Sequence, residues 1–176
     1  VLGREQHGHM EKVGYELYSR ILREELGETT ENFETELDVR AGAYIPEEYI
    51  PDSASRMDCY KQIAEIAEES DKKRVERSLT EVYGSIPKEV GTLIGIAVLK
   101  TKAKAVRAKK VLVKKECAEV TFASLECLDN EKLYASITAN KNCASLSFKQ
   151  NPVLRIEKPG MSAEQVLSFV TDFLAV

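Results

Sequence analysis

The sequence predicts an α+β domain in which helices come first and a largely antiparallel sheet of four or five strands follows, with a C-terminal helix packed on it. Apolar residues recur at helical spacing up to about residue 98, and after that they fall in short runs. Turn-forming pieces such as Asp129-Asn130 separate these runs. Segregated helices and closely connected strands are typical of α+β domains with antiparallel sheets.

The first expected element is a helix within residues 1–27, because apolar residues lie at helical spacing there and Gly27 can end it. Residues 28–36 are acidic and polar with few apolar anchors, which predicts a linker. We therefore expect a helical extension, a linker and then one domain over residues 37–176.

A short strand is expected at the start of this domain, where Leu37 and Val39 alternate with polar residues. Two X-Pro steps follow, at Ile45-Pro46 and Ile50-Pro51. Proline disfavours helical geometry in the residue before it, so residues 43–52 are predicted to form an ordered, rigid loop.

Three helices should follow the loop. The first has Ser53 or Ser55 as its cap, and the second runs from about Asp71 and ends at Gly84. The third has Pro87 in its first turn, where a missing N–H costs nothing.

The remaining apolar residues predict strands, followed by a closing helix. Ser162 and Gln165 have the spacing of a capping box, and the apolar stripe after them should pack on the sheet. The residues expected in strands are Val111, Val113, Val120, Phe122, Leu133, Tyr134, Ile137, Leu146, Phe148, Val153, Leu154 and Ile156.

Composition narrows the possible functions. No apolar stretch approaches the roughly 18 residues that span a bilayer, so no membrane partner is expected. The four cysteines lie 58, 10 and 16 positions apart, without a C-x-x-C pair, which argues for free thiols in a reducing cytoplasm and against a metal site. The chain starts at Val1 with neither methionine nor a signal peptide, so we expect a piece of a longer protein.

Motifs for catalysis are missing from the sequence. There is no P-loop, dinucleotide fingerprint, G-x-S-x-G elbow or H-E-x-x-H. Both histidines, His7 and His9, precede the expected domain. We therefore predict no catalytic residue and no metal ligand in this chain.

One basic segment stands out in a chain of net charge −4: residues 88–115 contain nine basic residues and one acidic residue. Lys100, Lys104, Lys109 and Lys110 are the candidate phosphate contacts if the segment binds duplex DNA. No aromatic residue interleaves with them to stack on bases. The alternatives are the solvated side of a helix and an edge strand, or a surface for an acidic protein partner.

Three blocks of residues resemble the family of bacterial transcription-repair coupling factors. Leu2–His9 followed by Val13–Tyr18 resembles the end of that family's helicase region. Ala43–Asp52, the tyrosine-proline block AYIPEEYIPD, is similar to the start of the family's C-terminal domain. Tyr83–Pro87 resembles a third signature, the step into a long helix.

The resemblance implies a parent protein that is an ATP-dependent DNA translocase using ATP and magnesium. Such a protein displaces stalled RNA polymerase from duplex DNA and recruits the excision-repair protein UvrA. Gln6, between Gly3 and Gly8, matches the translocation-motif glutamine that couples ATP state to movement. An amide side chain both donates and accepts hydrogen bonds, which suits such coupling.

For residues 37–176 the resemblance implies a non-catalytic regulatory domain. In the resting parent protein it packs on the N-terminal UvrA-binding module and hides that surface. The tyrosine-proline block allows two interpretations. Its side chains fill the junction between sheet and helices, or they contact the partner module, with Tyr44, Tyr49, Glu47, Glu48 and Arg56 as candidate interface residues.

Overall fold

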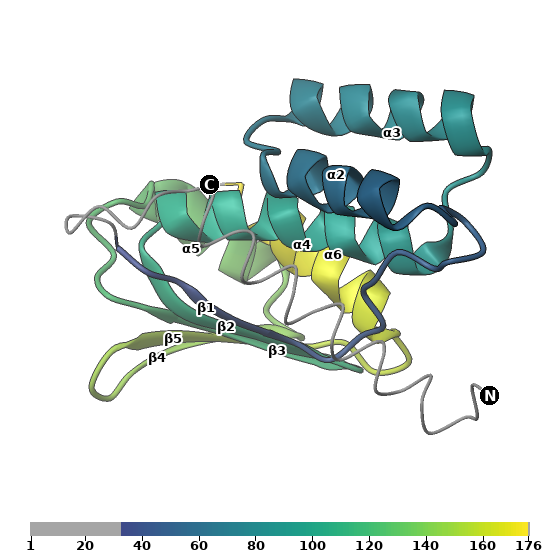
Figure 1. Ribbon diagram of the computed structural model, residues 1–176. Helices are drawn as coiled ribbons and strands as arrows, with labels where there is room; N and C mark the ends of the chain where they lie inside the picture. The colour runs from purple at the N-terminus through teal and green to yellow at the C-terminus, as the bar shows by residue number, and fades with distance from the viewer. Residues whose placement is uncertain (1–32, 176) are drawn as a thin grey trace. The chain divides into compact units, whose positions relative to one another are not determined.

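The structure is a computed structural model that describes residues 33–175 (Figure 1). The predicted α+β class is confirmed, with five helices and five strands in this part of the chain. The expected helix within 1–27 and most of the expected linker lie outside the described residues. The elements are β1 (Glu36–Val39), α2 (Ser53–Ala64), α3 (Glu69–Tyr83), α4 (Lys88–Ala105), β2 (Ala108–Lys114), β3 (Cys117–Phe122), α5 (Asn130–Ala139), β4 (Ala144–Phe148), β5 (Pro152–Glu157) and α6 (Ala163–Phe173).

The described chain divides into two compact units, and the division falls within α4. The first unit comprises residues 42–98, and the second comprises residues 33–41 and 99–175. The sequence led us to expect one domain over 37–176, and these limits remain a prediction. Each unit is described separately below.

The first unit contains α2, α3 and the beginning of α4. The side chain of Asp52 caps α2 by accepting a hydrogen bond from the backbone N–H of Ser55 at 2.8 Å, so the expected cap at Ser53 or Ser55 is corrected to Asp52. Helix α3 buries Val75 and Leu79, which are four residues apart and therefore on one face.

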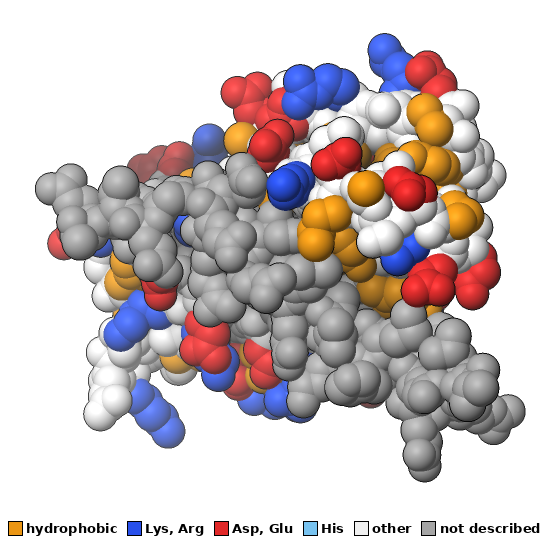
Figure 2. Space-filling model, viewed as in Figure 1, with side chains coloured by type: hydrophobic (Ala, Val, Ile, Leu, Met, Phe, Trp, Pro, Cys, Tyr) orange, Lys and Arg blue, Asp and Glu red, His pale blue; other side chains and the backbone are white. Residues whose placement is uncertain are grey.

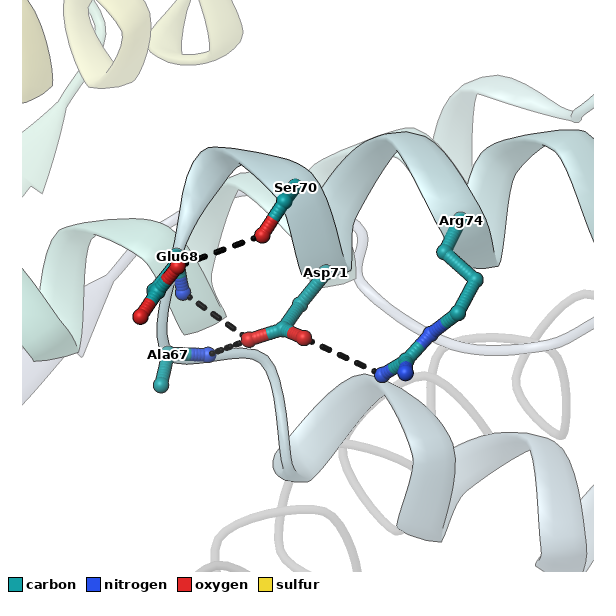
Figure 3. Close-up of polar contacts among 5 residues, drawn as sticks. All are labelled: Ala67, Glu68, Ser70, Asp71 and Arg74. Atoms are coloured by element: carbon teal, nitrogen blue, oxygen red, sulfur yellow. Dashed lines mark hydrogen bonds and ion pairs between the residues drawn. The ribbon is translucent and has the colours of Figure 1, made fainter.

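The start of α3 is stabilised by one carboxylate (Figure 3). Asp71 accepts hydrogen bonds from the backbone N–H groups of Ala67 and Glu68, both at 3.1 Å, and pairs with Arg74 at 3.1 Å. These backbone hydrogen bonds, followed by the charge of Arg74, hold the pKa of Asp71 below its ordinary value. The helix ends at Gly84, as predicted, with a φ of 85° that favours glycine.

The second unit is built on a five-stranded sheet of order β1-β2-β3-β5-β4. Strands β1 and β2 are parallel, and the other neighbours are antiparallel, which confirms the largely antiparallel prediction. Strand β2 is an interior strand, so the expectation that its lysines lie on an edge strand was wrong. Helix α6 packs against β2 and β3, and its expected capping box of Ser162 and Gln165 is present.

The residues Leu133, Tyr134 and Ile137 are not in a strand, as we had expected, but in helix α5. Asp129 is the cap of this helix, because its side chain accepts a hydrogen bond from the backbone N–H of Lys132 at 3.1 Å. Leu133 is fully buried. Its spacing of four from Ile137 fits a helical face, and the cap decides in favour of the helix.

The two faces of the sheet differ. Helices α5 and α6 lie over one face (Figure 1), toward which buried residues such as Val111, Val120 and Ile156 point. The alternate residues point to the other face, where charged side chains form two ion pairs across neighbouring strands and one within β5. Those ion pairs are Glu36–Lys110 at 3.7 Å, Glu119–Arg155 at 2.8 Å and Arg155–Glu157 at 3.0 Å.

Candidate functional site

The tyrosine–proline loop, residues 43–52, is the block with the most specific sequence signal, and it lies directly before α2. Four of its residues are buried: Ala43 is 1% exposed, Tyr44 8%, Ile45 4% and Ile50 0%. Its backbone is held from α2, because the hydroxyl of Tyr60 accepts the N–H of Ile45 at 2.9 Å. The expected ordered loop is therefore present as part of the packed core of the first unit.

Arg56 secures the other end of the loop. Its Nη1 donates to the carbonyl oxygens of Ile50 and Pro51, both at 2.9 Å, while Nη2 lies 3.8 Å from a carboxylate oxygen of Glu47. Its side chain is only 20% exposed. A planar guanidinium suits this task because it offers several donors in a fixed geometry.

Tyr49 joins the loop to the end of α3. Its hydroxyl donates to the carbonyl of Gly84 at 3.1 Å, and its ring lies 5.7 Å from the ring of Tyr83. Partial burial, followed by the nearby Cys59 and Tyr83, raises the pKa of Tyr49. Two sequence blocks that we had singled out separately, 43–52 and 83–87, thus meet through one hydrogen bond and one ring contact.

The exposed part of the loop is acidic. Glu47 and Glu48 are exposed, whereas Tyr49 is half-buried. Of the five candidate interface residues, Tyr44 and Arg56 act inside the unit, which supports the structural interpretation for these two. A contact of Glu47, Glu48 or Tyr49 with a partner remains a prediction. Over α2 and α3, at the upper right of Figure 2, acidic and basic side chains are interspersed with apolar ones.

The basic segment is divided between two elements, since Lys100 and Lys104 lie in α4 whereas Lys109 and Lys110 lie in β2. Several of its members are engaged within the second unit. Lys110 pairs with Glu36, and the guanidinium of Arg107 lies 4.9 Å from the ring of Phe33. In addition, Lys102 donates to the carbonyl of Thr171 at 3.4 Å.

This division spreads the basic side chains over a helix and an interior strand, and part of their charge is already paired. Phosphate contact by Lys100, Lys104, Lys109 and Lys110 remains a prediction. The translocation-motif residues Gln6, Gly3 and Gly8 lie outside the described residues.

Among residues 33–175, no group of three or more His, Cys, Asp or Glu side chains is placed to hold a metal ion. None of the helices described here has the length and apolar character needed to cross a membrane. Burial raises the pKa of the Cys59 thiol to about 11, which keeps it protonated at neutral pH.

Comparison with known proteins gives the family. Residues 39–133, which include the whole tyrosine–proline loop, match the TRCF domain. The chain belongs to the TRCF domain family. The transcription-repair-coupling factor of Bacillus subtilis is 33% identical to it over 99% of this chain, and the Escherichia coli one is 29% identical over 70% of it.

This chain spans only 16% of the length of the Bacillus subtilis protein and 12% of the length of the Escherichia coli one. A solved structure described as the C-terminal domain of transcription-repair coupling factor has the same fold, with a TM-score of 0.67. The alignment covers 80% of this chain and 91% of that one, at 20% sequence identity.

Proposed function

We propose that this chain is the C-terminal regulatory module of a transcription-repair coupling factor and that it covers the UvrA-binding module of the same protein in the resting state. Membership of the TRCF domain family supports this proposal, as does the similarity of nearly the whole chain to a small part of the Bacillus subtilis protein. The parent protein acts in the cytoplasm as an ATP-dependent DNA translocase that displaces stalled RNA polymerase.

In this proposal the chain contributes a contact surface, while ATP and magnesium bind elsewhere in the parent protein. The observation that carries this proposal is that polar side chains fix the backbone of the tyrosine–proline loop. Arg56 and the hydroxyls of Tyr49 and Tyr60 bond to backbone groups of their own unit, which holds the loop in one conformation. A preorganised loop loses little conformational entropy when it binds a partner.

The exposed tip of that loop, Glu47 and Glu48, is our candidate contact with the UvrA-binding module. Two adjacent exposed carboxylates on a rigid support can meet basic groups of a partner without rearrangement of the loop. Charges at the rim of an interface act mainly on the association rate and on its dependence on salt.

The test is a titration of the separately produced UvrA-binding module with this chain, followed by competition with UvrA. We expect saturable binding that UvrA displaces, and about 10-fold weaker binding for Glu47→Lys/Glu48→Lys. The matched control, Glu81→Lys/Glu126→Lys, makes the same change in net charge at two other exposed positions and should bind normally. Absence of binding by the unmodified chain would exclude the masking role.

The alternative that the sequence left open, duplex-DNA contact through the basic segment, is separated by a salt series. DNA contact would be favoured over masking by two results together. The logarithm of the DNA-binding constant would fall with the logarithm of the salt concentration at a slope of several charges, and Lys109→Glu/Lys110→Glu would abolish the binding. An ATP hydrolysis assay on the chain completes the comparison, since turnover by the chain alone would contradict a purely regulatory role.

A further inference from the structure

Within residues 33–175, strand β4 lies at an edge of the sheet. It is the last strand of the sheet, and β5 is its neighbour on one side only (Figure 1). Its sequence, Ala-Ser-Leu-Ser-Phe, contains neither a charged residue nor proline. Edge strands of monomeric proteins usually carry charges, proline or a bulge that prevents pairing with another strand.

The hydrogen-bond pattern defines which backbone groups this edge offers. Glu157 donates its N–H to the carbonyl of Cys143 at 2.7 Å, so Cys143 and the alternate residues after it direct their backbone groups toward β5. The backbone groups of Ala144, Leu146 and Phe148 therefore point to the free side. The N–H of Ala144 is already used, because it donates to the carbonyl of Asn140 at 2.8 Å.

We propose that β4 pairs antiparallel with β4 of a second copy of this chain, with Leu146 opposite Leu146 on the two-fold axis. In this register the backbone N–H of each Leu146 donates to the carbonyl of Leu146 in the other copy, and the N–H of each Phe148 donates to the carbonyl of Ala144 in the other copy. The Ala144 N–H, already bonded to Asn140, is not required. The pairing therefore forms four hydrogen bonds and leaves no backbone N–H of β4 without a partner.

The side chains match in the same register. Phe148, which is 60% exposed, comes to lie opposite the small side chain of Ala144, and Ser145 lies opposite Ser147. Lys149 faces Cys143, so no like charges are opposed. An edge that is complementary to itself is the requirement for a two-fold symmetric interface, which is why a second copy is the occupant that we infer.

The contact is small, and this sets its strength. Five residues a side bury much less than the roughly 1,200 Å² of a standard interface, so the dissociation constant should be on the order of 0.1 mM. Tyr134, in the helix that packs on β4, is 56% exposed. It and Phe148 are the large exposed apolar side chains of the described part of the second unit.

The experiment uses sedimentation velocity of the full 176-residue chain over a range of concentrations up to about 1 mM. We expect reversible dimerisation. Ser145→Glu/Ser147→Lys sets opposite charges across the two-fold axis and should tighten the dimer by about 10-fold, whereas Ser145→Glu/Ser147→Glu and Ser145→Lys/Ser147→Lys should each weaken it by at least 10-fold. Mixing the latter two should restore a dimer.

The variants also test the register. If Ser145 faced Ser145 instead, the Glu/Lys variant would set two glutamates opposite each other and weaken the dimer, which would overturn the proposed pairing. A chain that stays monomeric at all concentrations, or a dimer that ignores all three variants, would overturn it too. Both positions are exposed, and circular dichroism melts that match the unmodified chain confirm that each variant folds.

Discussion

Tyr60→Phe is the sharpest test of how the tyrosine–proline loop is held. The substitution removes one oxygen and keeps the ring in its buried site, where Tyr60 is 6% exposed. The N–H of Ile45, which that oxygen accepts at 2.9 Å, then stays buried without a partner. Leaving a buried donor unsatisfied costs about 1–3 kcal/mol, and the loss should lower the melting temperature by about 2–4 °C per kcal/mol in a chain of this length.

The assay is urea unfolding followed by circular dichroism, together with hydrogen exchange at the Ile45 amide. Exchange should accelerate by about 5- to 150-fold, since every 1.4 kcal/mol corresponds to a factor of ten. Tyr134→Phe is the control, because its hydroxyl lies on an exposed side chain and the change should stay within about 0.5 kcal/mol. If Tyr60→Phe unfolds at the urea concentration of the unmodified chain and the Ile45 exchange rate is unchanged, the hydrogen bond does not hold the loop.

Three further predictions concern other residues of the first unit and one cysteine of the second. Arg56→Lys should lower the free energy of unfolding in urea by about 1–2 kcal/mol, because an ammonium on a shorter side chain cannot reproduce the planar geometry in which Nη1 bonds the carbonyls of Ile50 and Pro51; an unchanged urea midpoint would contradict this. The pKa of Asp71 is lowered, so the stability that its carboxylate contributes is present above the ordinary value of 3.8 and is lost as pH falls through the pKa of the folded state. The difference in melting temperature between the unmodified chain and Asp71→Ala should therefore shrink below pH 3.8. A difference that stays constant with pH would contradict this prediction. At pH 8 iodoacetamide should alkylate the exposed Cys127 first. It should alkylate the buried Cys59, whose pKa is about 11, only when the chain unfolds, and peptide mass mapping would show the order. Early labelling of Cys59 would refute its burial.

Local signals in the sequence were sufficient for several elements of the fold. Gly84 ends α3 and Ser162 begins α6, because each residue acts on its own backbone neighbours. The segment from Leu133 to Ile137 was misassigned because a short apolar run fits both periods. The deciding feature was Asp129, which we took for a turn residue although its side chain caps a helix.

The candidate site was only half predictable, for a different reason. Two X-Pro steps predict a rigid loop from local sterics alone. The role of Arg56 depends on which carbonyl groups come within reach of its guanidinium once the chain has turned back, and the contact between Tyr49 and Gly84 joins residues 35 positions apart. No periodicity in the sequence reports such contacts.

The arrangement of the loop's polar groups bears on the proposed masking of the UvrA-binding module, because a masking contact must also be released. The groups that hold the loop in place, Arg56 and Tyr60, bond to its backbone, and the carboxylates of Glu47 and Glu48 are exposed, with Glu47 3.8 Å from Arg56. Exposed charges contribute modest free energy and are weakened by salt or by competing charges. A partner bound through such a tip is positioned accurately by the rigid loop and yet is displaced easily. Displacement should therefore leave the loop itself unchanged, and hydrogen exchange at Ile45 should be the same with and without the bound module.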